Sequence, residues 1–535
     1  MDALFSPVAV AVGAPVEQVK LLFCLLVSYP LGSIFIRVPG KTLKHVFNIT
    51  VALFYVIPVL NLYDGFLQLL VDVLVTYYVA KTVKGRRMPW MVFWLNMGHL
   101  TVNHVLRVVL GREDEPFDLT APQMVLVMKL TTFAWNVYDG QQLDSELDTW
   151  QTKMRVKQYP ALLEFLGYAF YFPGFLVGPF LEFNAYTSLV DGSLFKVTAK
   201  SGTSTAAPLS RKGRAIPDGR KRVAYRKGAI ALVYLVTFIL MVGSYHPSAM
   251  LTTSFLKKPL WSRVLFLQLC QFIARCKYYG IWQLTEGAAI LTGFGFSGFG
   301  PDGESLWAGA ANIDVFNVEL APNFKVLLDS WNMKTNQWLR ECIYKRVTAK
   351  GKKPGFRSSM LTFATSAFWH GIAPGYYITF VLGGFVTTAA RLVRQYIRPL
   401  VIPVPPSIQP GSKAKPPPLT PLKRAYDVLG TSVTFLVLNF VSAPFLLLSA
   451  RNSVEVWARV DYYGLWMVFA TLAFFYSGGR TWLKSLQARR VRNIEHAIEK
   501  EECDPSVALP PVDQAINEVR QEVEDLVQEI EKKLQ

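Results

Sequence analysis

An all-α polytopic membrane protein is the fold class that this sequence predicts. Of its 535 residues, 51% belong to the hydrophobic set and only 18% are charged, and the mean hydropathy is +0.26. Soluble proteins of this size are less apolar. Several stretches approach the roughly 20 apolar residues that cross a bilayer core, with basic flanks. We expect about ten to twelve membrane-embedded helices, some of them re-entrant.

The expected helices follow one another along most of the chain. The clearest have few or no charges; they are residues 21–36, 46–63, 88–106, 228–256, 428–450 and 462–479. Weaker stretches complete the set; they are residues 65–80, 119–138, 161–190, 259–299 and 358–390. The N-terminal segment has neither a basic n-region nor a convincing cleavage site, so we expect the first helix to act as the insertion signal.

Basic residues gather between these hydrophobic stretches, and their placement explains the net charge of +18. Two long basic loops, residues 191–227 and 399–424, are rich in small residues or in proline and are expected to lie in the cytosol. Shorter basic runs at 81–87 and 345–357 follow the positive-inside pattern. We therefore expect anionic membrane lipids, and no nucleic acid, to meet these cations.

The composition divides the chain into an N-terminal segment (1–20), a transmembrane domain (21–480) and a charged, helical cytosolic tail (481–535). The end of the tail repeats apolar residues at the spacing of a coiled-coil seam, which is compatible with self-association or with a helix packed on the protein or the membrane. Lys532 and Lys533 resemble a dilysine retrieval signal of the endoplasmic reticulum. Five scattered cysteines show no metal-ligand spacing and no paired framework, so we expect neither a metal site nor structural disulfides.

Ionisable side chains inside apolar stretches are candidates for function, because they are costly in a membrane. They are Asp72, His99, His104, Lys129, Asp139, Arg275, Lys277, Glu286 and His370. We expect Lys129 to form an internal ion pair with Asp139 or Glu286. Neighbouring hydroxyls and carbonyls are expected to satisfy His99 and His104.

His370 stands apart from the other ionisable residues. It follows a long uncharged run in "SSMLTFATSAFWHG" (358–371), and Asn332 precedes it in the polar, aromatic block "WNMKTNQWLRECIYKR" (331–346). An amide, a membrane imidazole and a basic loop between them suggest a catalytic constellation. Packing roles for both residues are the alternative.

Five blocks in the same order resemble the membrane-bound O-acyltransferase (MBOAT) family, in particular its fungal lysophospholipid acyltransferases. The blocks are "MVLVMKLTTFAWNVYDG" (124–140), "YAFYFPGFLVGPFLEFNAY" (168–186), "RCKYYGIWQLTEGAAILTGFGFSG" (275–298), "WNMKTNQWLRECIYKR" (331–346) and "FWHGIAPGYY" (368–377). The resemblance implies a helical bundle around an internal reaction chamber, with a cytosolic opening for acyl-CoA and a lateral one for the lipid acceptor. Asn332 and His370 match the signature asparagine and histidine.

The resemblance implies an acyl transfer from acyl-CoA to a lysophospholipid hydroxyl, without a metal, a cofactor or an acyl-enzyme. His370 would act as the general base, and Asn332 would stabilise the oxyanion or position substrate. Weaker candidates for substrate contacts each carry a polar side-chain group and lie within these blocks; they are Asn336, Trp331, Asp139, Lys129 and Glu286. Cations at the cytosolic mouth are candidates for binding the CoA phosphates; they are Lys345, Arg346, Lys350, Lys352, Lys353 and Arg357.

Two other functions compete with this interpretation. Another enzyme of the same family would acylate diacylglycerol, a sterol or a protein. A transporter or scramblase would use the intramembrane charges for a polar path, although the sequence lacks the internal repeat that transporters often show. The sequence determines neither the headgroup nor the acyl chain that is preferred.

Overall fold

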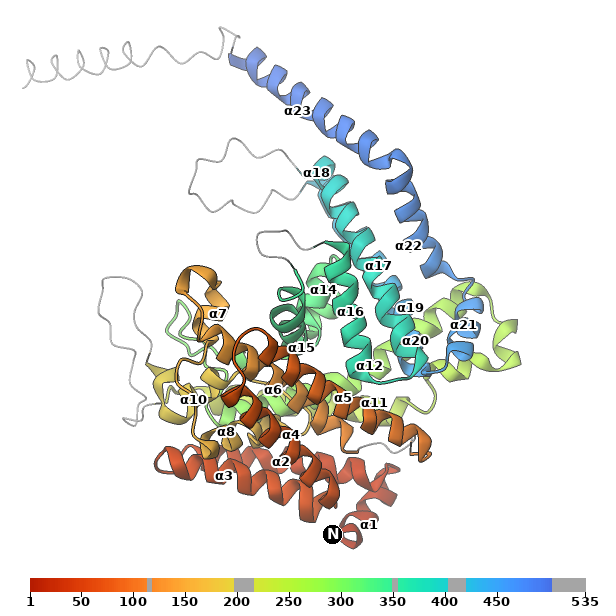
Figure 1. Cartoon of the computed structure of the whole chain (residues 1–535). Helices are drawn as coiled ribbons and strands as arrows, with labels where there is room; N and C mark the ends of the chain where they lie inside the picture. The colour runs from red at the N-terminus through yellow and green to blue at the C-terminus, as the bar shows by residue number, and fades with distance from the viewer. Residues whose placement is uncertain (113–117, 197–215, 349–354, 403–419, 503–535) are drawn as a thin grey trace, which may run out of the picture. The chain divides into compact units, whose positions relative to one another are not determined.

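The computed structural model is built of helices (Figure 1), as the sequence predicts. It describes residues 1–112, 118–196, 216–348, 355–402 and 420–502. Within these ranges the β structure is limited to an isolated bridge between Phe299 and Ser305. The chain forms two compact units: a main unit of residues 1–390 and 427–469, and a second unit of residues 391–426 and 470–535.

The long helices give the main unit its frame. They are α2 (Val16–Phe35), α4 (Tyr63–Thr82), α5 (Arg87–Val109), α6 (Thr120–Asp139), α11 (Arg220–Met241), α12 (Leu260–Leu291), α17 (Pro374–Tyr396) and α19 (Pro421–Val441), of which the last two cross the boundary between the units. Shorter helices are α1 (Asp2–Val12), α3 (Lys41–Phe54), α7 (Thr149–Met154), α8 (Leu162–Ala169), α9 (Phe172–Phe175), α10 (Phe183–Asp191), α13 (Val315–Glu319), α14 (Phe324–Ser330), α15 (Met333–Trp338), α16 (Phe356–His370), α20 (Ala443–Leu447), α21 (Ala450–Ala458) and α22 (Tyr463–Phe474).

Among the described residues, five helical segments are long and apolar enough to cross a membrane. They are Val16–Phe35, Lys41–Val59, Arg220–Met241, Pro374–Val401 and Pro421–Leu447. Helices α4, α5, α6 and α12 are also at least 20 residues long. Helix α6 is the most enclosed of these, because all but three of its residues are buried. It packs against α4 and α5, which lie beside it in Figure 1.

One expected helix, residues 161–190, is wrong as a single span. The structure breaks it into α8, α9 and α10. The sequence "FPGFLVGPF" (172–180) explains the breaks, because proline lacks a backbone donor and glycine accepts dihedrals that other residues avoid. Gly178 has a φ of 89°, in the left-handed region.

The expected stretch 358–390 also divides, and the division places the C-terminus of α16 at His370. Gly371 has a φ of 132° and Pro374 begins α17. Glycine accepts that φ easily, and a proline suits the first turn of a helix. His370 is therefore the last residue of α16, at a bend between two helices.

The second unit contains the end of α17, α18 (Arg398–Val401) and α23 (Arg480–Glu502). Leu392, Tyr396, Phe475 and Leu483 form its apolar cluster. The amide of Gln487 donates to the Tyr396 carbonyl at 2.7 Å, and so ties α23 to α17. The predicted coiled-coil seam and the dilysine pair lie outside the described residues.

Candidate active site

The imidazole of His370 is held in an aromatic cage. It stacks on Phe380, with ring centroids 5.1 Å apart and planes 20° apart, and meets Phe445 edge-on at 5.0 Å. Trp369 and Tyr376 lie at 4.7 and 5.6 Å. These rings fix the orientation of the imidazole without a polar partner, and its nitrogens make no hydrogen bond to the described residues. They are therefore available to a substrate.

The side-chain amide of Asn332 is also available to a substrate. It precedes α15 with a φ of 42°, a left-handed conformation that asparagine tolerates better than most residues. Its side chain does not cap α15. Asn312 does so instead, since its Oδ1 accepts from the Lys334 amide at 2.9 Å and its carbonyl accepts from the Met333 amide at 2.8 Å. The amide of Asn332 is thereby spared for another task.

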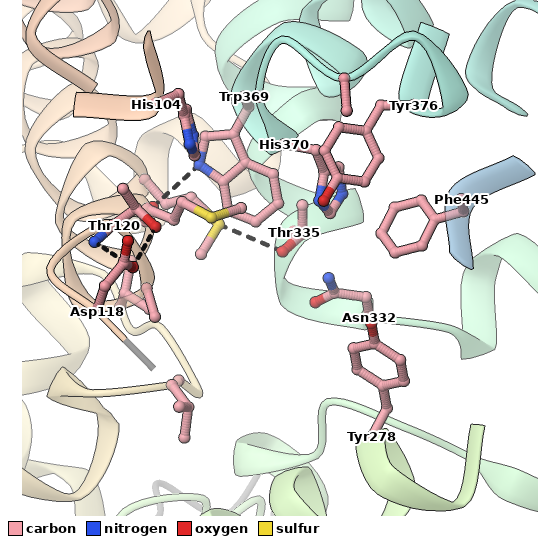
Figure 2. A pocket seen from close by; sticks show the side chains of 18 of the residues that line it. His104, Asp118, Thr120, Tyr278, Asn332, Thr335, Trp369, His370, Tyr376 and Phe445 are labelled. Carbon is pink, nitrogen blue, oxygen red and sulfur yellow. Dashed lines mark hydrogen bonds between the residues drawn. The ribbon is translucent and has the colours of Figure 1, made fainter. Parts of the chain in front are cut away.

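Two cavities of the main unit meet at these two residues. The large cavity has a volume of about 810 Å³ and the small one about 210 Å³. Residues that line both are Tyr278, Trp282, Asn332, His370 and Phe445. In Figure 2 the amide of Asn332 and the ring of His370 lie on the same side of the large cavity. A group entering from either cavity reaches the same imidazole and amide.

The two cavities differ in chemistry. The small one is lined mainly by apolar side chains, among them Phe324, Leu327, Phe363, Leu438 and Val441. Among the described residues, its one charged lining residue, Arg275, is paired with Glu319 at 2.7 Å. The charged residues among those that line the large cavity are Arg107, Asp118 and Lys334. The small cavity therefore suits a hydrocarbon chain, whereas the large one accepts a molecule with charged groups.

Helix α6 anchors the helices that carry the site residues through two indole hydrogen bonds. The indole of Trp338 in α15 donates to Thr131 Oγ1 at 2.9 Å. The indole of Trp369, beside the catalytic candidate, donates to the Met124 carbonyl at 3.0 Å (Figure 2). Because α6 is buried almost completely, α15 and α16 are anchored to the most enclosed helix of the unit.

Two of the predicted phosphate-binding cations are engaged with carboxylates and line neither cavity. Arg346 donates to both oxygens of Asp139, at 2.7 and 2.6 Å, and lies 4.3 Å above the ring of Trp135. Lys345 lies 2.6 Å from both Asp148 and Glu341. We call these five ionic residues (Asp139, Asp148, Glu341, Lys345 and Arg346) the ion-pair cluster.

The predicted ion pair of Lys129 is wrong. Its ammonium, fully buried, donates to the carbonyls of Tyr168 and Ala169 at 2.7 and 3.0 Å. These are the last carbonyls of α8, which lack intrahelical partners, so a cation is a favourable cap there. Glu286 instead lies 2.9 Å from Lys227, and neither Lys129 nor Glu286 lines a cavity.

The other sequence candidates are scattered. Trp331 lines the small cavity and packs edge-on against Trp282, with centroids 5.1 Å apart. Asn336 donates to the Leu328 carbonyl at 2.8 Å and lines neither cavity. Arg357 is exposed and also outside both linings. Lys350, Lys352 and Lys353 lie outside the described residues.

Of the two other intramembrane histidines, His99 differs from expectation, whereas His104 meets it in part, because its ring bonds the backbone of Trp369. His99 bonds a carboxylate and an amide, with Nδ1 at 2.7 Å from Asp72 and Nε2 at 3.2 Å from Gln68. His104 lines the large cavity, and its buried Nε2 has no hydrogen-bond partner among the described residues. Sequence reasoning missed its place in the site, along with Lys334 and Tyr376, both of which lie inside quoted sequence blocks. No group of three or more potential metal ligands occurs in the described ranges.

Comparisons with known proteins found one family model and several similar chains. A family model described as MBOAT, membrane-bound O-acyltransferase family, matches residues 112–415. A lysophospholipid acyltransferase of Schizosaccharomyces pombe is 38% identical over 92% of this chain and 93% of its own length. One of Saccharomyces cerevisiae is 34% identical over 86% of this chain and 74% of its own. The human membrane-bound glycerophospholipid O-acyltransferase 1 is 29% identical over 85% of this chain and 88% of its own.

Proposed function

This chain belongs to the membrane-bound O-acyltransferase family, and we propose that it transfers an acyl chain from acyl-CoA to the free hydroxyl of a lysophospholipid. The observation that carries the proposal is the meeting of two cavities at His370 and Asn332. One cavity suits a hydrocarbon chain, and the other suits a molecule with charged groups. A reaction that joins an acyl chain to a phospholipid needs both.

His370 acts as the general base in this proposal. An alcohol is a poor nucleophile near neutral pH, so a base must take its proton as the oxygen attacks the thioester carbonyl. The aromatic cage leaves the imidazole nitrogens unbonded, and a ring that is held only by packing accepts a proton without first losing a protein partner. The protonated ring then returns the proton to the departing CoA thiolate, so that ester and free thiol leave together.

Asn332 supports the same step from the other side of the reacting carbon. Attack on the carbonyl places negative charge on its oxygen, and an amide N–H that is already positioned stabilises that charge. The cap supplied by Asn312 leaves the Asn332 amide free to do so. The reaction requires no covalent intermediate, cofactor or metal. Lys334, which lines the large cavity, is the described cation best placed to meet a phosphate near Asn332.

The chain is a multi-pass membrane protein, and we place it in the endoplasmic reticulum membrane with a cytosolic tail. The dilysine pair near the C-terminus and the basic loops support that placement. The apolar seam of the tail supports self-association. Deleting residues 513–535 and then measuring the mass of the detergent-solubilised protein tests that association, and an unchanged mass contradicts it.

The activity test uses membranes from cells that express the wild type, His370→Ala or His246→Ala. His246 is a matched control because it directly precedes the short helical turn Pro247–Leu251 and lines neither cavity. Membranes receive oleoyl-CoA and a panel of lysophospholipids, and free CoA thiol and labelled phospholipid are followed together. We expect both products in step from the wild type and the control, and neither from His370→Ala at equal protein level.

Other outcomes point to the competing functions. Thiol release with diacylglycerol, a sterol or a peptide, but with no lysophospholipid, identifies a different acceptor within the family. Absence of thiol release with every acceptor contradicts acyl transfer and favours transport. Full activity of His370→Ala contradicts the base role while leaving the family unchanged.

A further inference from the structure

A second polar cluster lines the large cavity, away from Asn332. His104, Arg107 and Val108 project from one face of α5, because residues three and four apart are neighbours on a helix. Asp118 and Thr120 join them at the start of α6. Figure 2 shows His104, Asp118 and Thr120 on the side of the cavity opposite Asn332. We call His104, Arg107 and Asp118 the polar end of the cavity.

The polar end begins beside the catalytic candidate. A Cβ atom on Gly371, the residue after His370, would lie 3.4 Å from Nδ1 of His104. Arg107 is one helical turn further along α5, and Asp118 pairs with Arg107 at 3.3 Å. The cavity wall beside His370 therefore presents an imidazole and, next to it, a paired cation and anion.

His104 is the independent sign that something binds here. Its side chain is buried, with an exposed fraction of 7% for the residue, and its Nε2 has no hydrogen-bond partner among the described residues. A buried polar atom without a partner is unfavourable, and such atoms in a native structure require an explanation. A ligand group in the cavity supplies one.

The Arg107–Asp118 pair is partly accessible and held in place by its neighbours. The side chains are 26% and 16% exposed. Arg107 Nε also donates to the Arg112 carbonyl at 3.1 Å, and Asp118 Oδ1 accepts from Thr120 Oγ1 at 2.6 Å and from the Thr120 amide at 2.9 Å. Both charges thus have fixed positions. They can bind a ligand that places an anionic group beside Arg107 and a cationic group beside Asp118.

A zwitterionic headgroup has that arrangement. In a lysophospholipid the phosphate is attached to the glycerol that carries the reacting hydroxyl, and the ammonium of ethanolamine or choline lies beyond the phosphate. With the hydroxyl at His370, the phosphate falls beside His104 and Arg107, and the ammonium beside Asp118. Opposite charges brought together in a cavity of low polarity attract strongly.

Resting on the proposed function, we propose that the polar end binds the phosphate and ammonium of a zwitterionic lysophospholipid. Arg107 and the protonated ring of His104 donate to the phosphate oxygens, and the carboxylate of Asp118 pairs with the ammonium. These three residues position the acceptor and set its headgroup preference, while His370 performs the chemistry.

The position of the polar end along α5 separates it from the ion-pair cluster. At the beginning of that helix, Arg86 donates to the Arg346 carbonyl at 2.9 Å. Arg107 lies 21 residues later, which corresponds to roughly 30 Å along an α-helix. The headgroup of the acceptor and Arg346 consequently lie toward opposite ends of α5.

The test is a steady-state comparison of acceptors with the purified full-length enzyme and oleoyl-CoA. The acceptors are lysophosphatidylethanolamine, lysophosphatidylcholine, lysophosphatidic acid, which lacks the amine, and monoacylglycerol, which also lacks the phosphate. For Arg107→Gln we expect KM for all three phosphate-bearing acceptors to rise about tenfold or more, a change typical of one lost charge-assisted contact. The KM for oleoyl-CoA stays unchanged. For Asp118→Asn we expect KM to rise for the two amine-bearing acceptors only.

Two further variants exclude a merely structural role. Exchanging the charges, Arg107→Asp with Asp118→Arg, retains an ion pair. If the pair only stabilises the fold, the exchange restores activity, and this outcome overturns the proposal. Arg155→Gln breaks the Arg155–Asp144 pair outside both cavities and is expected to leave the order of acceptors unchanged. A uniform fall in kcat for every acceptor, monoacylglycerol included, with KM unchanged also overturns it. Wild-type failure with every lysophospholipid contradicts the proposed function itself.

Discussion

The ion-pair cluster and the site around His370 are both built from polar groups in an apolar protein, yet they satisfy those groups in opposite ways. In the cluster, each charge is paired with an opposite charge. Arg346, for example, donates two hydrogen bonds to Asp139. At the site, His370 is packed among aromatic rings, Asn332 does not cap its own helix, and His104 Nε2 has no hydrogen-bond partner in the part of the chain that the structure describes. Paired groups therefore indicate stability, and unpaired groups beside a cavity indicate chemistry.

The largest effect that tests this comparison is on catalysis at His370. We expect His370→Ala to reduce kcat by about 10²- to 10⁴-fold, the usual contribution of a general base. The thermal unfolding midpoint in detergent should fall less than for a variant that strands a buried charge, because the ring loses aromatic contacts but no ion pair. A large fall in the midpoint would mean that the ring is mainly a packing residue.

The next effect is on stability at Arg346. Removing one partner of a buried ion pair leaves an unpaired charge and costs about 3 to 5 kcal/mol. Arg346→Gln should therefore lower the unfolding midpoint strongly, and the double variant with Asp139→Asn should recover part of the loss. A stable Arg346→Gln enzyme with a raised KM for acyl-CoA would instead support the direct phosphate contact that the sequence suggested.

Replacing Asn332 is expected to lower kcat, as at His370, and not to lower stability, as at Arg346. Loss of one oxyanion donor lowers kcat by about 10²- to 10³-fold. Asn332→Ala should reach this range without reduced folding yield, because Asn312 caps α15. The strained φ of 42° makes Asn332→Gly the matched control, since glycine lacks the amide and accepts the backbone. Equal rate losses in both variants assign the effect to the amide.

The smallest effect should come from Lys345. Its side chain is 31% exposed and its partner Asp148 42% exposed, and ion pairs of this kind contribute about 0 to 1 kcal/mol. Its buried partner, Glu341, keeps Arg340 at 3.0 Å when Lys345 is replaced. We expect Lys345→Gln to change the unfolding midpoint by no more than a few degrees and the KM for acyl-CoA by less than twofold. A several-fold rise in that KM would return Lys345 to the set of substrate contacts.

The two residues at which the cavities meet were predictable from the sequence because each carries a local signal. His370 ends an uncharged run and precedes a glycine and a proline, and Asn332 lies in a block dense in polar and aromatic residues. The all-helical class follows from composition. The break in residues 161–190 was also visible in its glycines and prolines, although apolar length suggested a single helix.

The roles of the cations were not predictable in the same way. Arg346 and Lys334 lie in one short block, yet the first is held by Asp139, 207 positions earlier, and the second lines the large cavity. Lys129 meets carbonyls that become available only because α8 ends at Ala169. Partners so distant are set by tertiary packing, and local composition carries no record of them.

The enclosure of α6 has a consequence for how the protein is made. A ribosome that adds about 5 to 20 residues per second takes about 10 to 40 s to reach Arg346 after it has completed Asp139. During that interval the newborn helix carries a lysine and an aspartate, residues that resist insertion into a bilayer. The carbonyls that receive Lys129 emerge within a few seconds, whereas the carboxylate waits for a distant part of the same chain. The bidentate pair of α6 with Arg346 therefore forms only after most of the main unit has been synthesised.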